Sequence, residues 1–286
     1  MNKHLKGVVL IIISMFLFSL IGTFVRAINI GPERMLFFVS LFAALFLFIY
    51  FVFAKKLNKL IIKKGRFLLF FSGLLLILNT FSYFKAYTLT TFSNTVLVHY
   101  LAPVIAALLV PIFFKEKLEK ITIISLIISL FGLYLITSPN LALGSRHLTG
   151  MFFAFLSAIG YGLLIIVNKK LVEKLSLDAI LFYQSVIPAL ILLPFTGFNF
   201  SLTLIPFSLL VAYTLLVSIL PGFLYLAGIK KVEAQHVGII GYAEVIFVVL
   251  LGFLLFKEIP KITTFIGGLL ILFGGYLVIR AEAKRK

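Results

Sequence analysis

The sequence predicts an all-α integral membrane protein in which ten transmembrane helices form two inverted five-helix repeats. Three observations carry this prediction: an apolar composition, basic residues gathered in alternate loops, and motifs of the first half that recur in the second. The 286 residues are 62% hydrophobic and 12% charged, with a mean hydropathy of +1.21. Such values lie outside the usual composition of soluble domains, which argues against a water-soluble enzyme.

Ten apolar runs are long enough to cross a bilayer. A hydrocarbon core about 30 Å thick needs roughly 20 apolar residues in a helix, because it offers no partner to unpaired backbone groups. In chain order the runs are Leu5–Ile28, Glu33–Phe53, Phe67–Leu89, Thr91–Phe114, Ile121–Thr137, Thr149–Val167, Asp178–Phe195, Pro206–Gly228, His236–Phe256 and Ile262–Arg280. The links are short and rich in turn or basic residues, as in Asn29-Ile30-Gly31-Pro32, Lys55–Gly65, Ser138-Pro139-Asn140 and Thr196-Gly197-Phe198-Asn199. No soluble domain fits between them. The first run is kept as a span because it is long and has no evident signal-peptide cleavage site.

The net charge of +17, from 26 Lys+Arg and 9 Asp+Glu, reports topology. Positive loops are retained in the cytoplasm. With the N-terminus inside, 20 of the 26 basic residues fall in cytoplasmic loops, and the six outside are Arg26, Arg34, Lys85, Arg146, Lys257 and Lys261. We therefore expect a multi-pass plasma (inner) membrane protein of a prokaryote with both termini cytoplasmic. Nucleic acid is not needed to explain the charge.

The second half of the chain repeats the first at an offset of 142 residues. Phe114-Lys115-Glu116 matches Phe256-Lys257-Glu258, and 11 of the 28 positions from Leu109 to Ile136 are identical at this offset. We therefore predict two repeats, residues 1–140 and 141–286, with five helices each. Because five is odd, the second repeat enters the membrane in the opposite direction, an arrangement that is typical of transporters.

Short motifs in each half carry a family resemblance. Tyr83-x-x-Ala86-Tyr87-Thr88, Leu101-Ala102-Pro103-Val104 and Phe114-Lys115-Glu116 resemble the third and fourth helices of the EamA-type family in the drug/metabolite transporter superfamily. The second copy runs from Tyr225-Leu226-Ala227 through Tyr242-Ala243-Glu244-Val245 to Phe256-Lys257-Glu258. Members often carry Glu-Pro in the ninth helix, and Val245 here replaces the proline, so we expect a less kinked helix. Arg34 and Gln184 also fall where members often carry these residue types.

The resemblance implies a ten-helix fold with a central cavity, lined largely by helices 1, 3, 4, 6, 8 and 9. It also implies export or uptake of small metabolites. Amino acids or related compounds are the expected substrates. Nucleotide sugars or other anionic metabolites are the alternative, given the external arginines, and a membrane-embedded enzyme or scaffold is the alternative from a different class.

Glu244 and His99 are the clearest ionisable residues at bilayer depth, where such groups are expensive and hence candidates for function. Glu244 suits a substrate amine or a proton, or else it is a carboxyl satisfied by neighbouring helices. The repeat offset maps Glu244 onto Ala102, one helical turn from His99, so both side chains are expected on equivalent faces of helices 4 and 9. The alternative for His99 is a neutral ring hydrogen-bonded between helices.

Further polar residues complete the predicted substrate site and the predicted gates. Lys85 either contacts substrate or extends its ammonium group to the interface. Amphipathic rings and amides that could line a cavity are Tyr83, Asn94, Tyr161, Tyr225 and Tyr242. Arg26, Arg34, Glu116 and Glu258 are assigned gating or structural roles. Small residues in the fifth and tenth helices form a face that packs internally or dimerises, namely Ser125, Ser129, Gly132, Gly267 and Gly274.

Catalytic, cofactor and metal sites are not expected. The sequence has no cysteine, no Gly-rich phosphate loop and no His-Glu-x-x-His motif. The expected partners are a small-molecule substrate and the lipid bilayer, with proton coupling as an option and no nucleic acid. A monomer and a homodimer are both compatible with the sequence.

Overall fold

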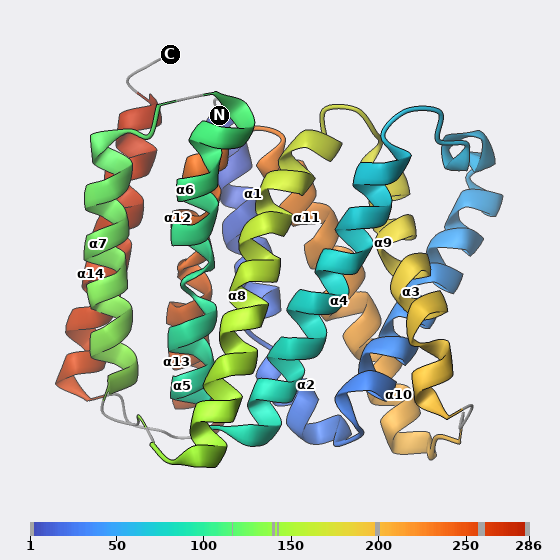
Figure 1. The fold of residues 1–286 in the computed structure, drawn as a ribbon, viewed down its shortest axis with the longest axis horizontal. Helices are drawn as coiled ribbons and strands as arrows, with labels where there is room; N and C mark the ends of the chain where they lie inside the picture. Colours follow the sequence, from blue (N-terminus) through green and yellow to red (C-terminus); the bar gives the residue numbers. More distant parts are fainter. Residues whose placement is uncertain are drawn as a thin grey trace.

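The computed structural model describes residues 3–115, 117–138, 141, 143–197, 201–256 and 261–283. Within these ranges ten helical spans are long and apolar enough to cross a membrane, and no strand is present (Figure 1). The predicted all-helical membrane fold is confirmed. The helices are α1 (Lys3–Phe18), α2 (Ile21–Ile28), α3 (Pro32–Phe53), α4 (Arg66–Leu89), α5 (Phe92–His99), α6 (Ala102–Phe114), α7 (Lys120–Thr137), α8 (Ser145–Leu171), α9 (Leu177–Leu192), α10 (Leu204–Tyr213), α11 (Leu220–Ile229), α12 (Ala234–Gly241), α13 (Ala243–Phe256) and α14 (Ile262–Ala283). Short 3-10 turns η1 (Leu57–Leu60) and η3 (Leu193–Thr196) and a π-helical turn η4 (Thr214–Ile219) complete the described elements.

Three spans that the sequence predicts as continuous are interrupted, and the eighth, although continuous, contains a π-helical turn. The first span breaks between α1 and α2, the fourth between α5 and α6, and the ninth between α12 and α13, while η4 loosens the eighth. The ninth helix, which was expected to be less kinked at Val245, is divided nearby at Tyr242. Gly241, a poor helix former, precedes the break, and the Tyr242 N–H bonds to the Ile239 carbonyl oxygen at 3.2 Å in a tightened turn.

The breaks in the fourth and ninth spans meet each other. In the fourth span the Val104 N–H bonds to the Leu101 carbonyl oxygen at 3.0 Å, so it does not pair with the Tyr100 carbonyl as a regular helix would require. The buried Tyr242 hydroxyl donates to that Tyr100 carbonyl oxygen at 2.9 Å. The break in the fourth span is thus covered by the ninth span, and the freed Tyr100 carbonyl oxygen has a partner within the protein.

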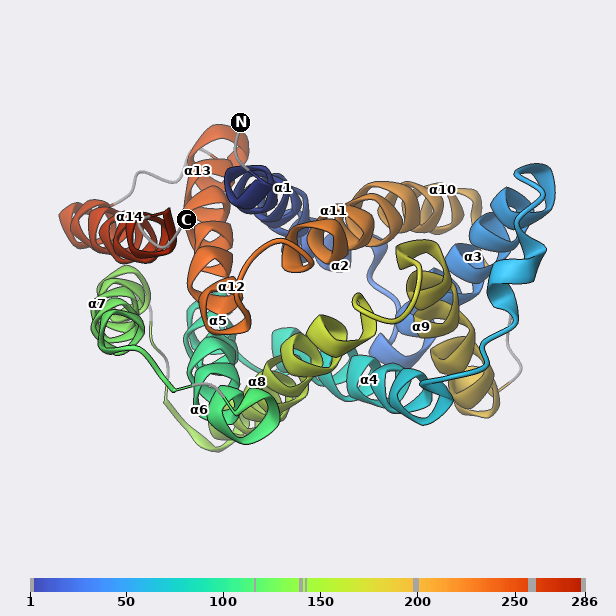
Figure 2. The ribbon, with the colours of Figure 1, turned by 90° about the horizontal axis from the view of Figure 1, so that it is seen from above.

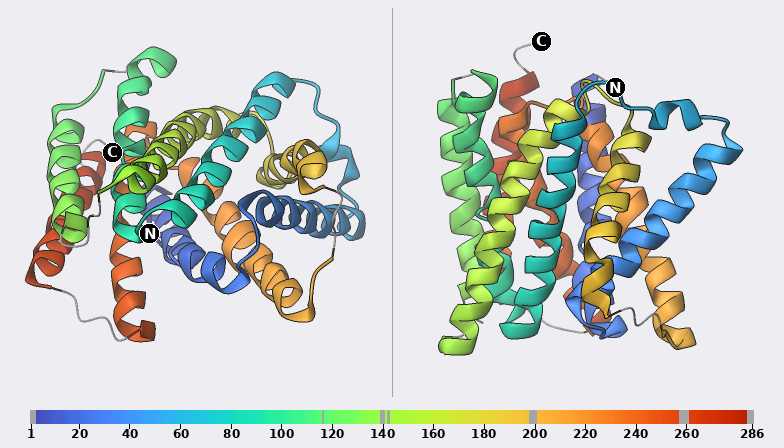
Figure 3. Two further views of the ribbon diagram at one scale, coloured as in Figure 1. Left: turned by 60° about the horizontal axis from the view of Figure 1, so that its bottom comes forward. Right: turned by 45° about the vertical axis from the view of Figure 1, so that its right-hand side comes forward.

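Spans from the two halves of the chain pack against each other in pairs. The closest pairs are α7 with α14, α4 with α8, α3 with α9, and α1 with α11. Seen from above, α7 and α14 lie together at one edge of the bundle, beside the spans formed by α5–α6 and α12–α13 (Figure 2). The helices α3, α9 and α10 lie toward the opposite edge, and two further views show the same arrangement (Figure 3).

The small residues of α7 and α14 bring these two helices into backbone contact. A Cβ atom placed on Gly132 would lie 2.5 Å from the Gly267 carbonyl oxygen, and one placed on Gly274 would lie 3.0 Å from the Ser125 carbonyl oxygen. Of the two roles considered for this face, internal packing is therefore the one that the structure shows. Close approach of this kind stabilises helix pairs through van der Waals contact in lipid.

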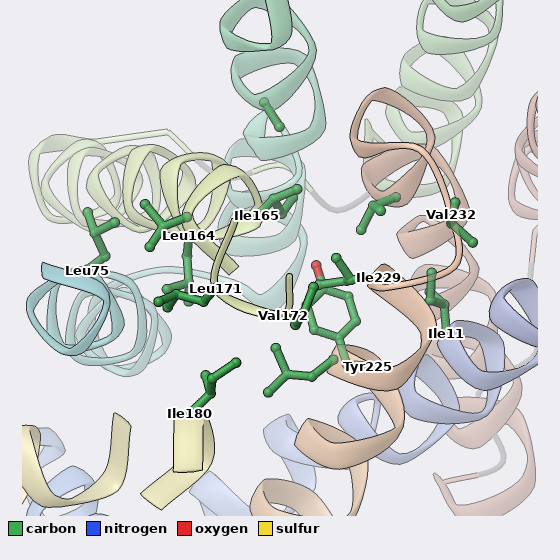
Figure 4. Close-up of a cluster of buried hydrophobic side chains, with 14 of the residues drawn as sticks. Ile11, Leu75, Leu164, Ile165, Leu171, Val172, Ile180, Tyr225, Ile229 and Val232 are labelled. Atoms are coloured by element: carbon green, nitrogen blue, oxygen red, sulfur yellow. The ribbon is translucent and has the colours of Figure 1, made fainter. Parts of the chain in front are cut away.

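Apolar side chains fill the space where α1, α8, α9 and α11 converge. Figure 4 shows this cluster, in which Ile11 of α1 and Ile229 of α11 lie near Ile165 of α8. Tyr225 lies among them and is one of the few polar groups in the cluster. Because lipid is as apolar as these side chains, their packing positions the helices more than it drives them together.

The start of α1 and the end of α14 lie at the same end of the bundle (Figure 1). The basic loops between α3 and α4, between α6 and α7, and between α8 and α9 lie at that end as well. This grouping is the one that the charge distribution predicts for the cytoplasmic face.

The contact between α7 and α14 provides a test of the packing. Gly267→Ala would place a methyl group against the Gly132 carbonyl oxygen, so we expect it to lower the apparent melting temperature in detergent, with a cost of about 1–3 kcal/mol. The matched control is Gly268→Ala, because no atom lies within 4 Å of a Cβ at that position. The control should be neutral or slightly stabilising, since alanine favours helix. Equal melting temperatures for both variants would contradict this packing.

Candidate functional site

A central cavity lies between the two halves of the chain, at the depth of the helix interruptions. The space in it that is open to a water-sized molecule has a volume of about 190 Å³. Eight spans contribute to its wall, namely the first four and the sixth to ninth. The family resemblance implied six of these, and the structure adds α3 and α9, which contribute Ser40 and Gln184 among others.

The structure brings five of the predicted site residues together at this cavity. They are Tyr83, His99, Tyr161, Tyr225 and Glu244. They come from five different spans of both halves, so no local sequence motif unites them. Their roles in binding stay predictions, but their convergence on one cavity is a structural fact.

Glu244 lies in the first turn of α13, directly after the break at Tyr242. The unpaired N–H groups at a helix N-terminus carry partial positive charge, which favours an acidic side chain there. The Tyr100 hydroxyl lies next to the Glu244 carboxyl group, although it makes no hydrogen bond of regular geometry. The helix break therefore both exposes Glu244 to the cavity and provides it with a polar surrounding.

Tyrosine rings surround the Glu244 carboxyl group. Tyr83, Tyr161, Tyr213 and Tyr225 line the same cavity and are close enough to Glu244 to interact with it electrostatically. The Tyr161 hydroxyl donates to the Tyr225 hydroxyl at 3.2 Å. The site is therefore an acidic group within an aromatic wall.

His99 connects this wall to a hydrogen-bonded chain across three spans. Its ring stacks on Tyr161 at 5.4 Å between centroids and lies 4.2 Å from the Tyr83 ring centroid. Its Nδ1 atom is 2.9 Å from the Ser157 hydroxyl, which donates to the Asn79 side-chain oxygen, also at 2.9 Å. Because Ser157 has a single hydroxyl proton, His99 is the donor in the first bond, and Nε2 is the acceptor nitrogen of the neutral ring. His99 thus lines the cavity and is also hydrogen-bonded between helices, so its two predicted roles coexist.

Several lining residues escaped the sequence analysis. Asn79 and Tyr213 were not singled out, and Asn168, whose side-chain oxygen accepts from Gln184 at 2.7 Å, was not assigned to the site. Asn79 lies in mid-span, and the argument from the cost of polar groups at bilayer depth would have found it, had it been applied to amides as well as to ionisable groups. Tyr213 had no such signal, because one more tyrosine in an aromatic-rich chain is unremarkable.

Three predicted substrate-binding residues do not line the cavity. Asn94 is buried in the first turn of α5 and donates to the Thr90 hydroxyl at 2.8 Å. Tyr242 is fully buried and bonds to the Tyr100 carbonyl oxygen. Lys85 is half-buried near the end of α4. Asn94 and Tyr242 thus have hydrogen-bond partners within the protein.

The predicted gating residues are only partly described. Arg34 donates to the Ser201 carbonyl oxygen at 2.8 Å, which joins the start of α3 to the segment before α10 at the end of the bundle away from the termini. The side chain of Arg26 lies outside the described part of the structure, as do Glu116 and Glu258. Their predicted roles are therefore neither supported nor opposed.

A second polar cluster lies at the end of the bundle that holds the termini. A carboxylate oxygen of Glu119, one of Glu233 and a ring nitrogen of His236 lie within 4.8 Å of one another. The Gln235 amide nitrogen donates to Glu119 at 2.8 Å and to Glu233 at 3.1 Å, so an amide holds the two carboxylates together. The cluster joins the loop before α7 to the start of α12 and thus connects the two halves of the chain. We regard it as a structural contact between them.

A membrane-spanning helical bundle built around a central cavity is an architecture typical of small-molecule transporters. The chain belongs to the EamA-like transporter family, whose model matches residues 5–138 and 148–280. This is a family of transporters and not of enzymes.

Comparisons with individual proteins agree with this membership. The chain is 31% identical over 199 residues to the uncharacterized transporter YxxF of Bacillus subtilis, a match that covers 68% of this chain and 63% of that protein. It is 26% identical over 213 residues to an S-adenosylmethionine uptake transporter of Rickettsia bellii, with 74% of this chain and 72% of that protein covered. The chain thus spans slightly less than two thirds of the Bacillus relative. A solved crystal structure with 17% identity superimposes with a TM-score of 0.79 over 96% of this chain and 98% of that one, which shows the fold.

The hydrogen-bonded chain at His99 provides a test of the site geometry. Ser157→Ala removes the hydroxyl group that both His99 and Asn79 contact, and leaving buried polar groups unpaired costs about 1–3 kcal/mol. We expect a lower apparent melting temperature for this variant. Ser208→Ala is the matched control, because Ser208 is exposed and bonds only within its own helix. If the two variants melt alike, the Ser157 contacts do not stabilise the protein.

Proposed function

We propose that this protein is a secondary active transporter that moves small organic metabolites by alternating access, in export or exchange. Amino acids and related compounds are the first substrates to test. The observation that carries the proposal is the cavity at bilayer depth between the two halves of the chain, with Glu244 as the one acidic residue among the described residues of its wall. A binding site in this position can open to either side of a membrane when the halves move.

Pairs of residues related by the repeat offset support an inverted two-fold relationship. Tyr100 and Tyr242 are 142 residues apart, and they contact each other through a hydrogen bond and through rings whose centroids are 5.7 Å apart. In α7 and α14, the Gly132–Gly267 contact maps onto the contact between Gly274 and Ser125 when the two halves are exchanged. Such reciprocal contacts are expected where a pseudo-two-fold axis passes between equivalent helices.

The pairing of spans supports the same relationship. Exchange of the halves turns the α4–α8 pair into the α11–α1 pair, and it turns the α3–α9 and α7–α14 pairs into themselves. The fifth and tenth spans, α7 and α14, contribute nothing to the described cavity wall, so the wall is also built from equivalent spans. We therefore retain residues 1–140 and 141–286 as the two proposed repeats.

Contacts between the halves at the end that holds the termini would have to break when the cavity opens there. Lys59 forms a salt bridge of 3.4 Å with Asp178, and the Tyr183 hydroxyl donates to the Leu60 carbonyl oxygen at 2.6 Å. The Gln235–Glu119 contact lies at the same end. At the other end, Arg34 joins Ser201 and Arg146 donates to the Thr88 carbonyl oxygen at 3.1 Å. These few polar contacts are candidates for gates on both sides.

The wall of the cavity supports substrates with an amine or another cationic group. Glu244 is an acidic partner for such a group, and no Lys or Arg is among the described lining residues. S-adenosylmethionine, in the name of the Rickettsia relative, is itself an amino acid with a positively charged sulfur. Anionic nucleotides find no basic partner here, so the alternative of a nucleotide-sugar exchanger loses its support.

The orientation of the chain is part of the proposal. We place both termini in the cytoplasm of a prokaryotic cell and the protein in its plasma membrane. The support is the excess of basic residues in the loops at the end of the bundle where α1 begins and α14 ends.

Counterflow into proteoliposomes tests the transport function. The panel contains labelled amino acids, S-adenosylmethionine, a nucleotide sugar and a neutral sugar. We expect saturable exchange with at least one amine-bearing compound, and a loss of roughly tenfold or more in Glu244→Gln and His99→Ala with normal membrane insertion. Glu173→Gln, at an exposed site away from the cavity, is the matched control and should transport normally.

Two outcomes of this experiment would count against the proposal. A scaffold or an enzyme would show no saturable exchange with any compound of the panel. Undiminished flux in both cavity variants would leave transport intact but remove Glu244 and His99 from it. Proton coupling is tested in the same vesicles, because a pH gradient that leaves the flux unchanged removes the proton from the mechanism.

A further inference from the structure

We infer that the central cavity selects organic cations, and that it holds the positive charge against the aromatic rings of Tyr83, Tyr161 and Tyr225 beside Glu244. This inference rests on the proposed transport function and narrows its substrate class. The charge on the ligand is the property that the site recognises. An onium group, such as a quaternary ammonium or a sulfonium, fits this site best.

First, the charges of the residues that line the cavity favour a cationic ligand. Among its described lining residues Glu244 is the one acid, and neither Lys nor Arg occurs. A carboxylate at bilayer depth without a basic partner is costly, and a bound cation relieves that cost. A substrate that carries net negative charge would increase the free-energy cost of the carboxylate.

The arrangement of the rings is the second argument. Tyr83, His99, Tyr161 and Tyr225 form a continuous series, with centroid distances of 4.2 Å, 5.4 Å and 6.5 Å between successive rings. The series continues through Phe18, whose centroid is 6.3 Å from that of Tyr225. The electron-rich faces of such rings attract cations within about 6 Å, and the attraction is larger where water is excluded.

The hydrogen bonds of these rings are the third argument. Tyr161 donates its hydroxyl proton to Tyr225, and the Tyr83 hydroxyl accepts from Tyr87 at 2.8 Å. His99 donates from Nδ1 to Ser157. The proton of Tyr161 is therefore used within the protein, and what this ring offers a ligand is mainly its π surface. An onium group, which has no N–H to donate, is suited to that surface. His99 stacks against the Tyr83 and Tyr161 rings and holds them in place.

A binding measurement on the purified full-length protein tests the inference with two probes of the same shape. Choline carries a quaternary nitrogen, and 3,3-dimethylbutan-1-ol has a carbon atom in its place and no charge. We expect choline to bind at least about tenfold more tightly than the neutral alcohol in a competition assay with labelled choline. Equal affinities, or no binding of choline, would overturn the inference without any variant being needed.

Ring variants separate the aromatic contribution from the fold. Tyr161→Phe keeps the π face and should bind choline within about threefold of the wild type, whereas Tyr161→Leu should lose roughly tenfold. Glu244→Gln should weaken choline more than the alcohol. Equal affinity of the Phe and Leu variants would overturn the role of the ring.

The outcomes distinguish this inference from the transport function. Saturable counterflow that prefers neutral or anionic compounds would agree with the transport function but contradict the selectivity for cations. The absence of counterflow for every compound would remove both.

Discussion

The constraint on which the structure depends is that hydrocarbon offers no hydrogen-bond partner to a broken helix. Interrupted spans are therefore tolerated only where other parts of the protein cover them. The fourth span meets this condition through the ninth, because the Tyr242 hydroxyl binds the carbonyl oxygen of Tyr100, which the break leaves without its regular helical partner. The break in the ninth span in turn creates the N-terminus of α13, where Glu244 lies. The turn at Tyr242 thus provides the hydroxyl group that binds the Tyr100 carbonyl oxygen, and it also places Glu244 beside the cavity.

From this point the chemistry of the site follows from what surrounds Glu244. Four tyrosines from three spans lie around it, and His99 is held among them by stacking on Tyr161 and by its bond to Ser157. Around this centre the paired spans of the two halves form the wall. The α7–α14 pair lies outside the wall, with its glycines and serines in close contact. The α7–α14 pair thus packs closely outside the cavity. The described contacts between the halves at the two ends of the bundle are polar.

Much of this organisation could be predicted from the sequence. The ten spans follow from the length of the apolar runs, and the offset of 142 residues already pairs Tyr100 with Tyr242. Glu244 and His99 stood out because ionisable groups are rare at bilayer depth. The breaks were not predicted, since hydropathy reports the environment of a residue and not its backbone hydrogen bonds. Asn94 and Tyr242 were assigned to the site although they lie outside the described cavity wall, because residue type alone does not reveal which way a side chain packs. The contributions of α3 and α9 to the wall likewise depend on helix packing that no local pattern encodes.

We propose that the two halves move around the cavity so that one end closes as the other opens. The chain has no cysteine, so pairs of spin labels can be placed at engineered cysteines without background. One pair at Lys63 and Lys174 spans the halves at the end that holds the termini, and one pair at Thr88 and Ser208 spans them at the other end; all four side chains are exposed. Distances measured by pulsed electron spin resonance, with and without a transported substrate, should change in opposite directions at the two ends. Distances that stay fixed, or that change in the same direction at both ends, would contradict the claim.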